Sequence, residues 1–532
     1  MSTFKLFSMA ALALMMAACS SEDNEILQNT QQPGTMHFTA TIAAPSGDAT
    51  TRTAYTEDGT TINVKWEVGD QIALVHNGVV DVAEVKTVDD VTGKATIEAN
   101  ITGSPSDDDV VYLAYPADAV VSATPDYGFP FTPNHEIFDK VKKKQDGTLA
   151  YIQDNLDLRM GSGKLAVSGS DVTLKGSVSV SSLICIWKLT LQDESSNALS
   201  ATKLTFKNNT DTQAKATSTG GKSEYYLCVV PSFIPDASGT FSFEATVGGD
   251  TYTFWKTGLS LTDGKYYQST VKLAKPTNLS TISSDYQVKN GEVLTGTLGS
   301  NVKISIADGA TVMLKDVTIN GVKSDSYEWA GITCAGDATI ILEGDNTVKG
   351  FYEDYPGIQV PVDKTLTIKG PGTLNVSSNG IGAAGIGGGE DGACGNIVIS
   401  GGTITATGGE GAAGIGSGQS YDENASCGNI TISGGTITAT GGEGAAGIGS
   451  GQGYTTPGSY RPSTCGTVTI TSGVTSVTAT KGSGATNSIG SGKKSTCGTV
   501  TIGGTEYWDG SAYKNGGDTY LTTSPLTYPA AP

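Results

Sequence analysis

Two carboxylates in the C-terminal half of this 532-residue chain occupy equivalent places in a repeated phrase. Glu410 and Glu443 each stand in the sequence Gly-Gly-Glu-Gly-Ala-Ala-Gly-Ile-Gly. If successive phrases stack, the two carboxylates lie about 5 Å apart and repel each other, unless a cation intervenes or they splay into water. Carboxylate oxygens are hard ligands that suit calcium. The pair is therefore a candidate calcium site, with two solvated carboxylates as the alternative.

Two longer loops in the same half gather side chains of the kind that hold sugar rings. Aromatic faces, carboxylates and a guanidinium occur together in them: Tyr421, Asp422 and Glu423 in the first loop, Tyr454, Tyr460 and Arg461 in the second. Aromatic surfaces with a few polar groups are a usual lining of ligand sites. An upstream group has the same character: Tyr327, Trp329, Tyr352 and Tyr355. The alternative is that these are only longer surface loops.

Side chains suited to catalysis are scarce. The sequence has three histidines, none of them after His135, and Arg461 is the only arginine in the C-terminal half. No pair of acids at a defined spacing marks a hydrolase. We therefore expect no enzymatic activity, and a polysaccharide lyase is the less favoured alternative. With 53 acidic against 33 basic residues and a net charge of −20, the chain lacks the positive charge of a nucleic-acid-binding protein.

A long repeat must position these loops. Cysteines recur with spacings of 33, 38 and 32 residues, each opening a phrase of alternating apolar and polar residues: Cys394, Cys427, Cys465 and Cys497. Such a period, broken by glycine turns, is typical of coils that stack on copies of themselves. Stacking predicts two isoleucine columns: Ile399 over Ile432, Ile470 and Ile502, and Ile386 over Ile415, Ile448 and Ile489. We interpret residues 279–510 as a right-handed parallel β-helix, followed by a C-terminal tail at 511–532.

The four cysteines form a column of their own in this interpretation. Parallel neighbours about 4.8 Å apart permit a disulfide by distance, but parallel Cβ vectors fit its geometry poorly. A metal site needs four converging ligands, whereas a column spreads its sulfurs along the axis. We therefore expect free, unliganded thiols.

The middle of the chain predicts strands rather than helices. Residues 36–275 contain short runs of β-branched and aromatic residues, broken by glycine, aspartate, asparagine and proline, without a 3.6-residue apolar period. This pattern favours antiparallel sandwiches. Glycines near residue 161 suggest two lobes, at 36–163 and 164–275. Cys185 and Cys228 lie in apolar strands, where pairing and separate burial both stay open. The basic run at 141–144 is expected in a solvated loop.

The first residues indicate export. Residues 1–18 contain one lysine and an apolar run too short to span a bilayer, which is typical of a secretion signal. The sequence Met-Ala-Ala-Cys that ends at Cys19 resembles a bacterial lipobox, which implies lipid attachment at that cysteine. A secretion signal with a chance cysteine is the alternative. The acidic segment 19–35 resembles the tether of Bacteroidota surface lipoproteins, which implies an outer-membrane, lipid-anchored chain exposed on the cell surface.

Short motifs in the middle resemble the fimbrillin-like proteins of Bacteroidota. They are Arg52-Thr53-Ala54-Tyr55, the run from Val64 to Ile72, and Gly264-Lys265-Tyr266-Tyr267. The resemblance implies two transthyretin-like β-sandwich lobes, related to pilus subunits and tip adhesins. In polymerising members a protease cuts after an arginine near the first strand, and Arg52 is the arginine available here. An ordinary strand residue is the alternative, and a β-helix in place of a donor strand argues against polymerisation.

The glycine-rich half resembles bacterial surface β-helix proteins described as carbohydrate-binding-domain-containing. The shared phrases are Gly-Gly-x-Ile-x-Ala and Ala-Gly-Ile-Gly. The resemblance implies polysaccharide binding, with calcium as a helper, on a fold shared with pectate lyases. Together the two resemblances predict an all-β surface lipoprotein adhesin whose stalk presents a carbohydrate-binding β-helix. The expected partner is a polysaccharide or a host or microbial surface glycan, with other fimbrial subunits as further candidates. A structural pilus component is the main alternative.

Overall fold

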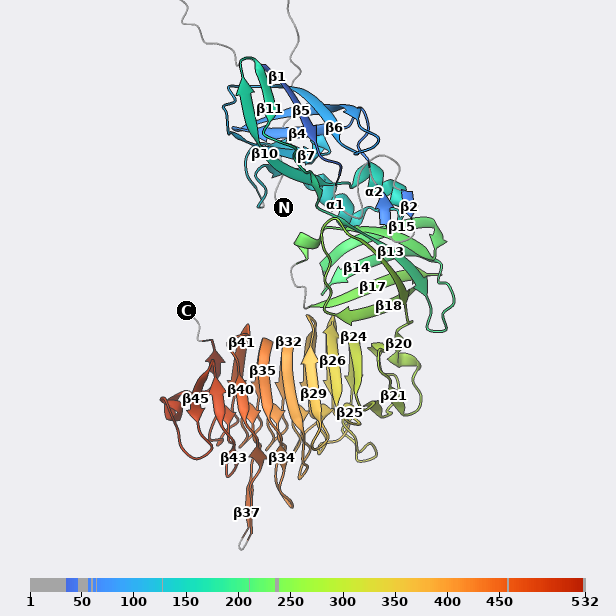
Figure 1. The fold of residues 1–532 in the computed structure, drawn as a ribbon. Coiled ribbons are helices and arrows are strands. Elements are labelled where there is room, and N and C mark those ends of the chain that lie inside the picture. The colour runs from blue at the N-terminus through green and yellow to red at the C-terminus, as the bar shows by residue number, and fades with distance from the viewer. Residues whose placement is uncertain are drawn as a thin grey trace, which may run out of the picture.

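The computed structural model describes residues 35–45, 56–58, 61–63, 65–126, 128–209, 211–234, 239–456 and 459–529. The expected signal at 1–18, Cys19 with nearly all of the tether, and Arg52 lie outside these residues. The described residues form two β-rich lobes followed by a parallel β-helix (Figure 1), so the all-β fold class is confirmed. Among them, no helix has the length and apolar character that a membrane span requires.

The first lobe is built on one sheet that closes on itself. Its strands follow the order β11-β1-β6-β5-β4-β7-β10-β12, and β10 also pairs with β11. Their bounds are β1 (Met36–Ile42), β4 (Gln71–His76), β5 (Val79–Val88), β6 (Ala95–Ile101), β7 (Val110–Tyr115), β10 (Arg159–Ser168), β11 (Asp171–Leu174) and β12 (Ser181–Ser182). Successive side chains of a strand point to opposite faces, and the inward ones fill a core that includes Phe38, Trp66 and Ile72. Two short hairpins lie outside this sheet: β2 (Thr56–Asp58) with β3 (Thr61–Asn63), where Ile62 packs in a cluster with residues of both lobes, and β8 (Val120–Ser122) with β9 (Thr132–Pro133).

The glycines near residue 161 lie inside a strand and do not separate the lobes. Strand β10 runs across the boundary expected between residues 163 and 164. A Cβ atom at Gly161 would overlap the backbone of Ser179, and one at Gly163 would press on the side chain of Val178. Glycine in a strand often marks such a close approach. The lobe continues through β12, and the division falls near Leu183.

The second lobe is a sandwich of two sheets. One has the order β16-β13-β19 and the other β15-β14-β17-β18. Their bounds are β13 (Cys185–Gln192), β14 (Ala201–Asn208), β15 (Asp211–Lys222), β16 (Glu224–Val229), β17 (Thr240–Val247), β18 (Asp250–Thr257) and β19 (Tyr266–Lys272). In its core, the ring of Trp187 lies edge-on to Phe206 and Phe243, with centroids 5.6 and 5.2 Å apart.

Cys185 and Cys228 are free, buried thiols. Cys185 pairs with Val229 and Ile186 pairs with Cys228 in neighbouring strands. Because side chains alternate along a strand, the two sulfurs lie on opposite faces of the sheet. They belong to different apolar clusters, and this answers the question of pairing that the sequence left open.

Two short helices, which follow β9 in the chain, pack between the lobes, where the sequence predicted only strands and loops. Helix α1 (His135–Lys143) is capped by the side chain of Asn134, which accepts a hydrogen bond from the backbone N–H of Glu136. It buries Ile137 and Val141, half-buries Lys140 and Lys142 and exposes Lys143, so most of the basic run expected in a loop belongs to this helix. Helix α2 (Leu149–Asn155) follows and buries Ile152. The apolar face of α1 is too short to show a period in the sequence.

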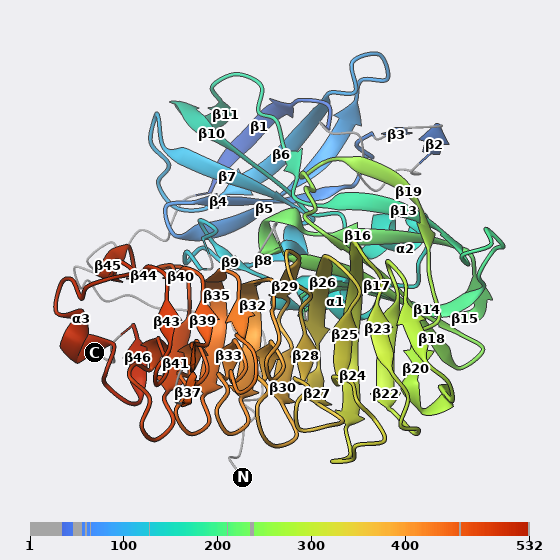
Figure 2. The ribbon, with the colours of Figure 1, turned by 90° about the horizontal axis from the view of Figure 1, so that it is seen from below.

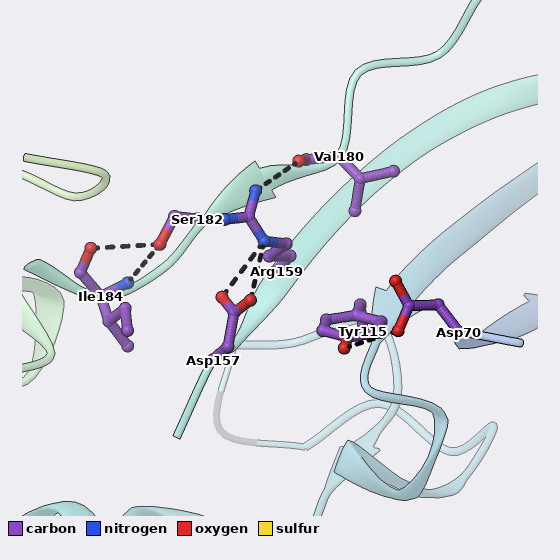
Figure 3. Close-up of polar contacts among 7 residues, drawn as sticks. All are labelled: Asp70, Tyr115, Asp157, Arg159, Val180, Ser182 and Ile184. Atoms are coloured by element: carbon purple, nitrogen blue, oxygen red, sulfur yellow. Dashed lines mark hydrogen bonds and ion pairs between the residues drawn. The ribbon is translucent and has the colours of Figure 1, made fainter. Parts of the chain in front are cut away.

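A buried ion pair fixes the end of the first lobe (Figure 3). The side chain of Arg159, at the start of β10, is fully buried, and its Nε donates to the carboxylate oxygens of Asp157 at 3.1 and 3.3 Å. Its Nη1 lies 3.5 Å from the carbonyl oxygen of Val180. Nearby, the hydroxyl of Tyr115 donates to Asp70 at 3.1 Å. These contacts hold the strand ends from which the chain passes into the second lobe.

The β-helix stacks its coils in a single row from β20 to β45 (Figures 1 and 2). Its largest sheet comprises β20 (Thr277–Asn278), β22 (Val293–Thr297), β24 (Ala310–Asn320), β26 (Ala338–Glu343), β27 (Asp345–Lys349), β29 (Thr365–Lys369), β30 (Thr373–Ser377), β32 (Asn396–Thr407), β35 (Ile430–Thr440), β40 (Val468–Ile470), β41 (Ser476–Thr480), β44 (Val500–Ile502), β45 (Thr505–Trp508) and β46 (Leu526–Tyr528). A second sheet comprises β21 (Tyr286–Val288), β23 (Ile304–Ile306), β25 (Ile332–Cys334), β28 (Ile358–Gln359), β31 (Ile386–Gly387), β33 (Ile415–Gly416), β36 (Ile448–Gly449) and β42 (Ile489–Gly490). A third comprises β34 (Ser426–Cys427), β39 (Thr464–Cys465) and β43 (Thr496–Cys497).

Equivalent residues of successive coils are direct neighbours, as the repeat predicted. Ile399 pairs with Ile432, which continues to Ile470 and Ile502, and the column that begins at Ile386 continues likewise. Beside this second column, Gly387, Gly416 and Gly449 have φ angles of 135°, 139° and 134°. A Cβ atom at Gly387 or Gly416 would overlap the carbonyl oxygen of the next coil's glycine. Only glycine fits both the conformation and the space.

The described part of the segment expected to be a tail, residues 511–529, closes the end of the β-helix together with strand β45. Strand β45 pairs antiparallel with β44, and β46 pairs antiparallel with β41. Helix α3 (Gly517–Tyr520) lies between them in the chain, and Leu521 and Leu526 are buried in the β-helix core. These elements cover strands of the last coils whose edges would otherwise be free to pair with another chain.

Four charged side chains join the second lobe to the β-helix. Lys207 and Glu244, on β14 and β17, meet Lys315 and Glu343, on β24 and β26. The Nζ of Lys207 lies 2.9 Å from a carboxylate oxygen of Glu244, and that of Lys315 lies 3.0 Å from Glu343 and contacts Glu244 as well. Burial raises the pKa of Glu244, but hydrogen bonds from Lys315 and Lys207 outweigh it and leave that pKa below its usual value.

An apolar contact accompanies this ion network. Trp255 of β18 packs on a small cluster of Val293, Met313 and Ile341 on the outer surface of the first coils. The lobe and the β-helix therefore meet through a buried interface with charged and apolar parts.

Candidate functional site

The loops singled out in the sequence lie on one side of the β-helix. The loops of Tyr421 and Tyr454 each leave an Ile-Gly strand of the second sheet and return to a cysteine strand of the third, whereas residues 352–355 lie between β27 and β28. Their strand β37 (Tyr454–Thr456) and its neighbours β34 and β43 project away from the two lobes (Figure 1). We call the surface formed by residues 352–355, 390–391, 421–423, 454–456 and 459–461 the lateral surface.

Backbone hydrogen bonds connect these loops from coil to coil. The N–H of Glu390 donates to the carbonyl oxygen of Asp354 at 3.1 Å, and that of Asp391 donates to Gln419 at 2.8 Å. The N–H of Ser420 donates to the carbonyl oxygen of Gln452 at 3.0 Å. The loops therefore continue the regular stacking of the coils, and side chains separated by one repeat come into contact.

Two tyrosines from successive loops form the aromatic centre of the lateral surface. The ring centroids of Tyr421 and Tyr454 lie 4.9 Å apart, with 45° between the ring planes. Tyr421 is 46% exposed. Tyr454 faces Arg461 across the hairpin of β37 and β38 (Ser459–Arg461). The structure thus brings together three of the residues predicted to bind a sugar.

Tyr460 has a different position. It precedes Arg461, the partner of Tyr454, by one residue and so points to the other face of the hairpin. It is 56% exposed, and its hydroxyl donates to the carbonyl oxygen of Lys494 at 3.1 Å. Its contact is therefore with the next coil, on the far side of the hairpin from Tyr421.

Asp391 positions the first of these loops, although the sequence did not single it out. Its carboxylate accepts hydrogen bonds from the backbone N–H groups of Tyr421, at 2.5 Å, and Asp422, at 2.8 Å. Its own φ angle is 50°, a left-handed conformation that aspartate tolerates better than most residues. The sequence offered one indication of this role: Asp391 lies one repeat before the loop of Tyr421, shortly ahead of Cys394.

Glu390 and Asp354 link the two patches that the sequence suggested separately. Burial, a hydrogen bond with Asp354, and the charges of Asp354, Asp391 and Asp422 raise the pKa of Glu390 to about 7. Tyr352 and Tyr355 flank Asp354 in the chain and are half-buried. Acidic side chains therefore run along the axis from the upstream tyrosines to Asp422, next to Tyr421. Glu423 is exposed beside them.

Tyr327 and Trp329 contribute to packing. Their ring centroids lie 5.3 Å apart, and Trp329 lies 5.7 Å from Phe351, which is fully buried. Both pack against the β-helix core. The structure does not bring these two residues to the Tyr421–Tyr454 pair.

Glu410 and Glu443 occupy neighbouring coils in register, because the N–H of Gly411 donates to the carbonyl oxygen of Glu443 at 3.0 Å. Both side chains are exposed. Across the described parts of the chain, no group of three or more histidine, cysteine, aspartate or glutamate side chains could hold a metal ion. A calcium site at this pair stays a prediction.

The cysteine column departs from the expectation of free thiols. Cys394 and Cys427 form a disulfide, with their Cα atoms 4.4 Å apart. The Cα atoms of these coils approach more closely than the usual strand spacing of about 4.8 Å, and this lets the sulfurs meet although both side chains point the same way. Cys465 and Cys497 remain free.

Comparison with protein families finds a match in the β-helix. A family model described as a β-helix repeat matches residues 397–419 and 430–452. The comparison with curated proteins found no significant match.

Solved structures similar to the chain include three from Bacteroidota. A fimbrial protein from Bacteroides ovatus is 15% identical with a TM-score of 0.26, over 45% of this chain and 49% of its own length, so the chain spans about half of that protein. A fimbrial assembly protein from Parabacteroides distasonis is 12% identical with a TM-score of 0.28, over 45% of this chain and 92% of its own. A putative cell adhesion protein from Bacteroides uniformis is 14% identical with a TM-score of 0.26, over 45% and 93%. These similarities are too low to carry a functional argument.

Proposed function

We propose that the chain is a cell-surface adhesin in which the two lobes carry the β-helix and its lateral surface binds carbohydrate. The observation that supports this most is the Tyr421–Tyr454 pair, with centroids 4.9 Å apart and Tyr421 46% exposed. Aromatic faces beside a few polar groups suit a ligand with both apolar and hydroxylated surfaces. The neighbouring carboxylates of Asp422 and Glu390 are acceptors for sugar hydroxyls.

The direction of the lateral surface also supports the proposal. It faces away from the lobes (Figure 1), so that a stalk anchored at its N-terminal end would present it outward. The anchor in this proposal is the lipid on Cys19, in the outer membrane. The partner is a polysaccharide or a glycan of a host or microbial surface, and contact with other fimbrial subunits is a second possible association. The proposal assigns the chain no catalytic activity.

Glycan binding by the whole chain without residues 1–19 tests the proposal. We expect retention of a subset of an array of glycans, and at least a tenfold loss of affinity, about 1.4 kcal/mol, in the double variant Tyr421→Ala/Tyr454→Ala. Val91→Ala is the matched control, because Val91 is 94% exposed on the first lobe. Unchanged glycan binding by the double variant would show that the lateral surface is not the binding site.

The two rivals predict different results in the same preparation. A structural pilus component would retain no glycan and would polymerise after cleavage at Arg52. A lyase would release unsaturated uronates from pectin-like polymers, which ultraviolet absorbance detects. Either result, in the absence of glycan retention, would replace the adhesin proposal.

A further inference from the structure

Two free cysteines stand one coil apart at the bases of lateral loops. Cys465 ends the loop that carries the β37–β38 hairpin, and Cys497 ends the turn of the next coil. The two are direct partners in the parallel ladder of the third sheet. Both are almost fully buried, at 6% and 5% exposure. Their side chains therefore share the narrow interior of the β-helix.

The same relation holds for the pair that is already joined. Cys394 and Cys427 are also one coil apart and also end lateral loops, and they form a disulfide across a Cα–Cα distance of 4.4 Å. The Sγ of Cys427 lies 3.5 Å from the carbonyl oxygen of Gly395 in the preceding coil. The Sγ of Cys497 lies 3.4 Å from the carbonyl oxygen of the equivalent Gly466. Cys465 points the same way, since its Sγ lies 3.9 Å from the carbonyl oxygen of Gly428. Each cysteine after Cys394 therefore points towards the coil before it, an orientation that fits a bond between ladder partners.

We propose that Cys465 and Cys497 form a second disulfide, which ties the base of the hairpin to the following coil. The column has four members, and this pairing uses all of them. A bond between Cys427 and Cys465, which are also ladder partners, would leave Cys394 and Cys497 three coils apart. That separation far exceeds the reach of a disulfide, about 7 Å between Cα atoms.

The pKa of Cys465 agrees with direct contact between its thiol and that of Cys497. Hydrogen bonding with Cys497, burial and the charge of Cys497 hold the pKa of Cys465 well above its usual value. The thiolate, which is the reactive species, is therefore scarce in the folded protein. Oxidation belongs to the folding stage, before the two thiols are buried.

The reaction needs an oxidant of the disulfide class, such as oxidised glutathione or the disulfide of an oxidase outside the cytoplasm. A thiolate of one cysteine attacks a sulfur of that disulfide and releases one thiol. The second cysteine then attacks the mixed disulfide and releases the other. Two protein thiols lose two protons and two electrons, and the oxidant becomes two thiols.

The bond has a consequence for the hairpin. Tyr454 and Arg461 stand on the two strands that precede Cys465, so a covalent link at their base holds the tyrosine against Tyr421. This consequence for ligand binding rests on the proposed function, whereas the existence of the bond does not.

The test is a count of free thiols and a map of linked peptides. The chain without residues 1–19 is folded with oxidised glutathione, denatured and titrated for thiols. We expect the five free thiols of the structure to fall to three, at Cys185, Cys228 and Cys334, and a linked peptide pair that contains Cys465 and Cys497. Five free thiols after oxidation, or a link between Cys427 and Cys465, would overturn the proposal.

A variant separates the second bond from the first. Cys497→Ser should leave four free thiols, keep the Cys394–Cys427 link and increase hydrogen exchange at the base of the hairpin. An unchanged exchange rate there would show that no bond held the hairpin in the wild type. If the variant fails to fold, the count and the peptide map of the wild-type chain still decide the question.

Discussion

The second lobe and the β-helix bury their apolar side chains in different ways. In the lobe, Trp187 contacts Phe206 and Phe243, which come from two other strands, and each of these contacts is made once. In the β-helix, Ile399 contacts Ile432, and the same contact returns between later coils down to Ile502. A lobe therefore depends on unique contacts across its whole core, while a coil depends on its two neighbours.

Because of this difference, the two regions should lose stability through different substitutions. Removing a unique partner in a lobe weakens the entire lobe, because no equivalent contact exists elsewhere. In the β-helix, equivalent contacts in other coils remain when one apolar side chain is removed. Its glycines are more sensitive, because the neighbouring coil leaves no space for an added Cβ atom. The following substitutions test this contrast, and hydrogen exchange followed by mass spectrometry reports on lobes and β-helix separately.

The largest effect is expected in the first lobe. Arg159→Met leaves the buried carboxylate of Asp157 without its cation, which should lower the free energy of unfolding by about 3–5 kcal/mol. Denaturant unfolding measures this loss, and exchange should increase in the first lobe and not in the coils after β29. The double variant Asp157→Asn/Arg159→Met should recover part of the stability, since it removes the uncompensated charge. No recovery would show that the arginine acts mainly through packing.

A smaller but localised effect is expected in the β-helix. Gly416→Ala forces a side chain into a φ of 139° and against the carbonyl oxygen of Gly449, at a cost of about 2–4 kcal/mol. Exchange should increase in the coils on either side and remain unchanged in the lobes. Gly220→Ala is the matched control, because a Cβ atom there meets nothing within 4 Å. An equal loss of stability in the two variants would contradict the argument from close stacking.

The junction between the two regions should respond to pH. The pKa of Glu244 is below its usual value of 4.5 in the folded protein, so the unfolded chain binds the proton more tightly. Its stabilising contribution is complete above pH 4.5 and is lost as the pH falls through the folded-state value. Glu244→Gln should cost about 1–2 kcal/mol near neutral pH and flatten the stability curve below pH 4.5.

Glu410→Gln, which changes an exposed carboxylate of the β-helix, is the control for this curve. The acid branch of Glu244→Gln should be flatter than that of this control. If the two variants have the same acid branch, the junction does not carry the pH dependence.

A pH effect of opposite sign is expected on the lateral surface. The pKa of Glu390 is raised from 4.5 to about 7, so the folded protein binds the proton more tightly than the unfolded chain. Stability should therefore fall as the pH rises from 4.5 to about 7, and Glu390→Gln should remove this slope. Carbon-13 resonances of the carboxyl groups measure the titration directly. A midpoint near 4.5 would show that Asp354 and Glu390 do not interact as the structure has them.

The sequence predicted the β-helix well, because residues that contact each other in successive coils have the same position in successive repeats. Residues with the same place in successive phrases became ladder partners, as Ile415 did with Ile448. The repeat also located the loops of Tyr421 and Tyr454, although not the angle between their rings. In the lobes, no pattern in the amino-acid sequence indicates that Trp187 contacts Phe243. The glycines of β10 suggested a domain boundary, whereas in the structure they allow a close contact between strands.

The parts that the sequence missed depend on contacts between unlike residues. Asp391 and Glu390 gain their roles from hydrogen bonds with the neighbouring coils. These bonds join unlike residues, so the sequence repeat does not predict them. The disulfide between Cys394 and Cys427 depends on a Cα distance that the ideal strand spacing did not give. The cap at 511–529 belongs to no repeat at all, so its role was invisible before the fold was known.

The cap makes the length of the β-helix adjustable. Strand β45 pairs with β44 and strand β46 pairs with β41, so the cap rests on the last coils, while Trp255 and the ion network join the second lobe to coils near the other end. Duplication of one internal unit would therefore lengthen the rod by about 4.8 Å and leave both ends intact. Each added unit would also bring one more lateral loop, free to diverge in sequence while its coil stays fixed. A gene for such a chain can extend its recognition surface in steps, without redesigning the fold.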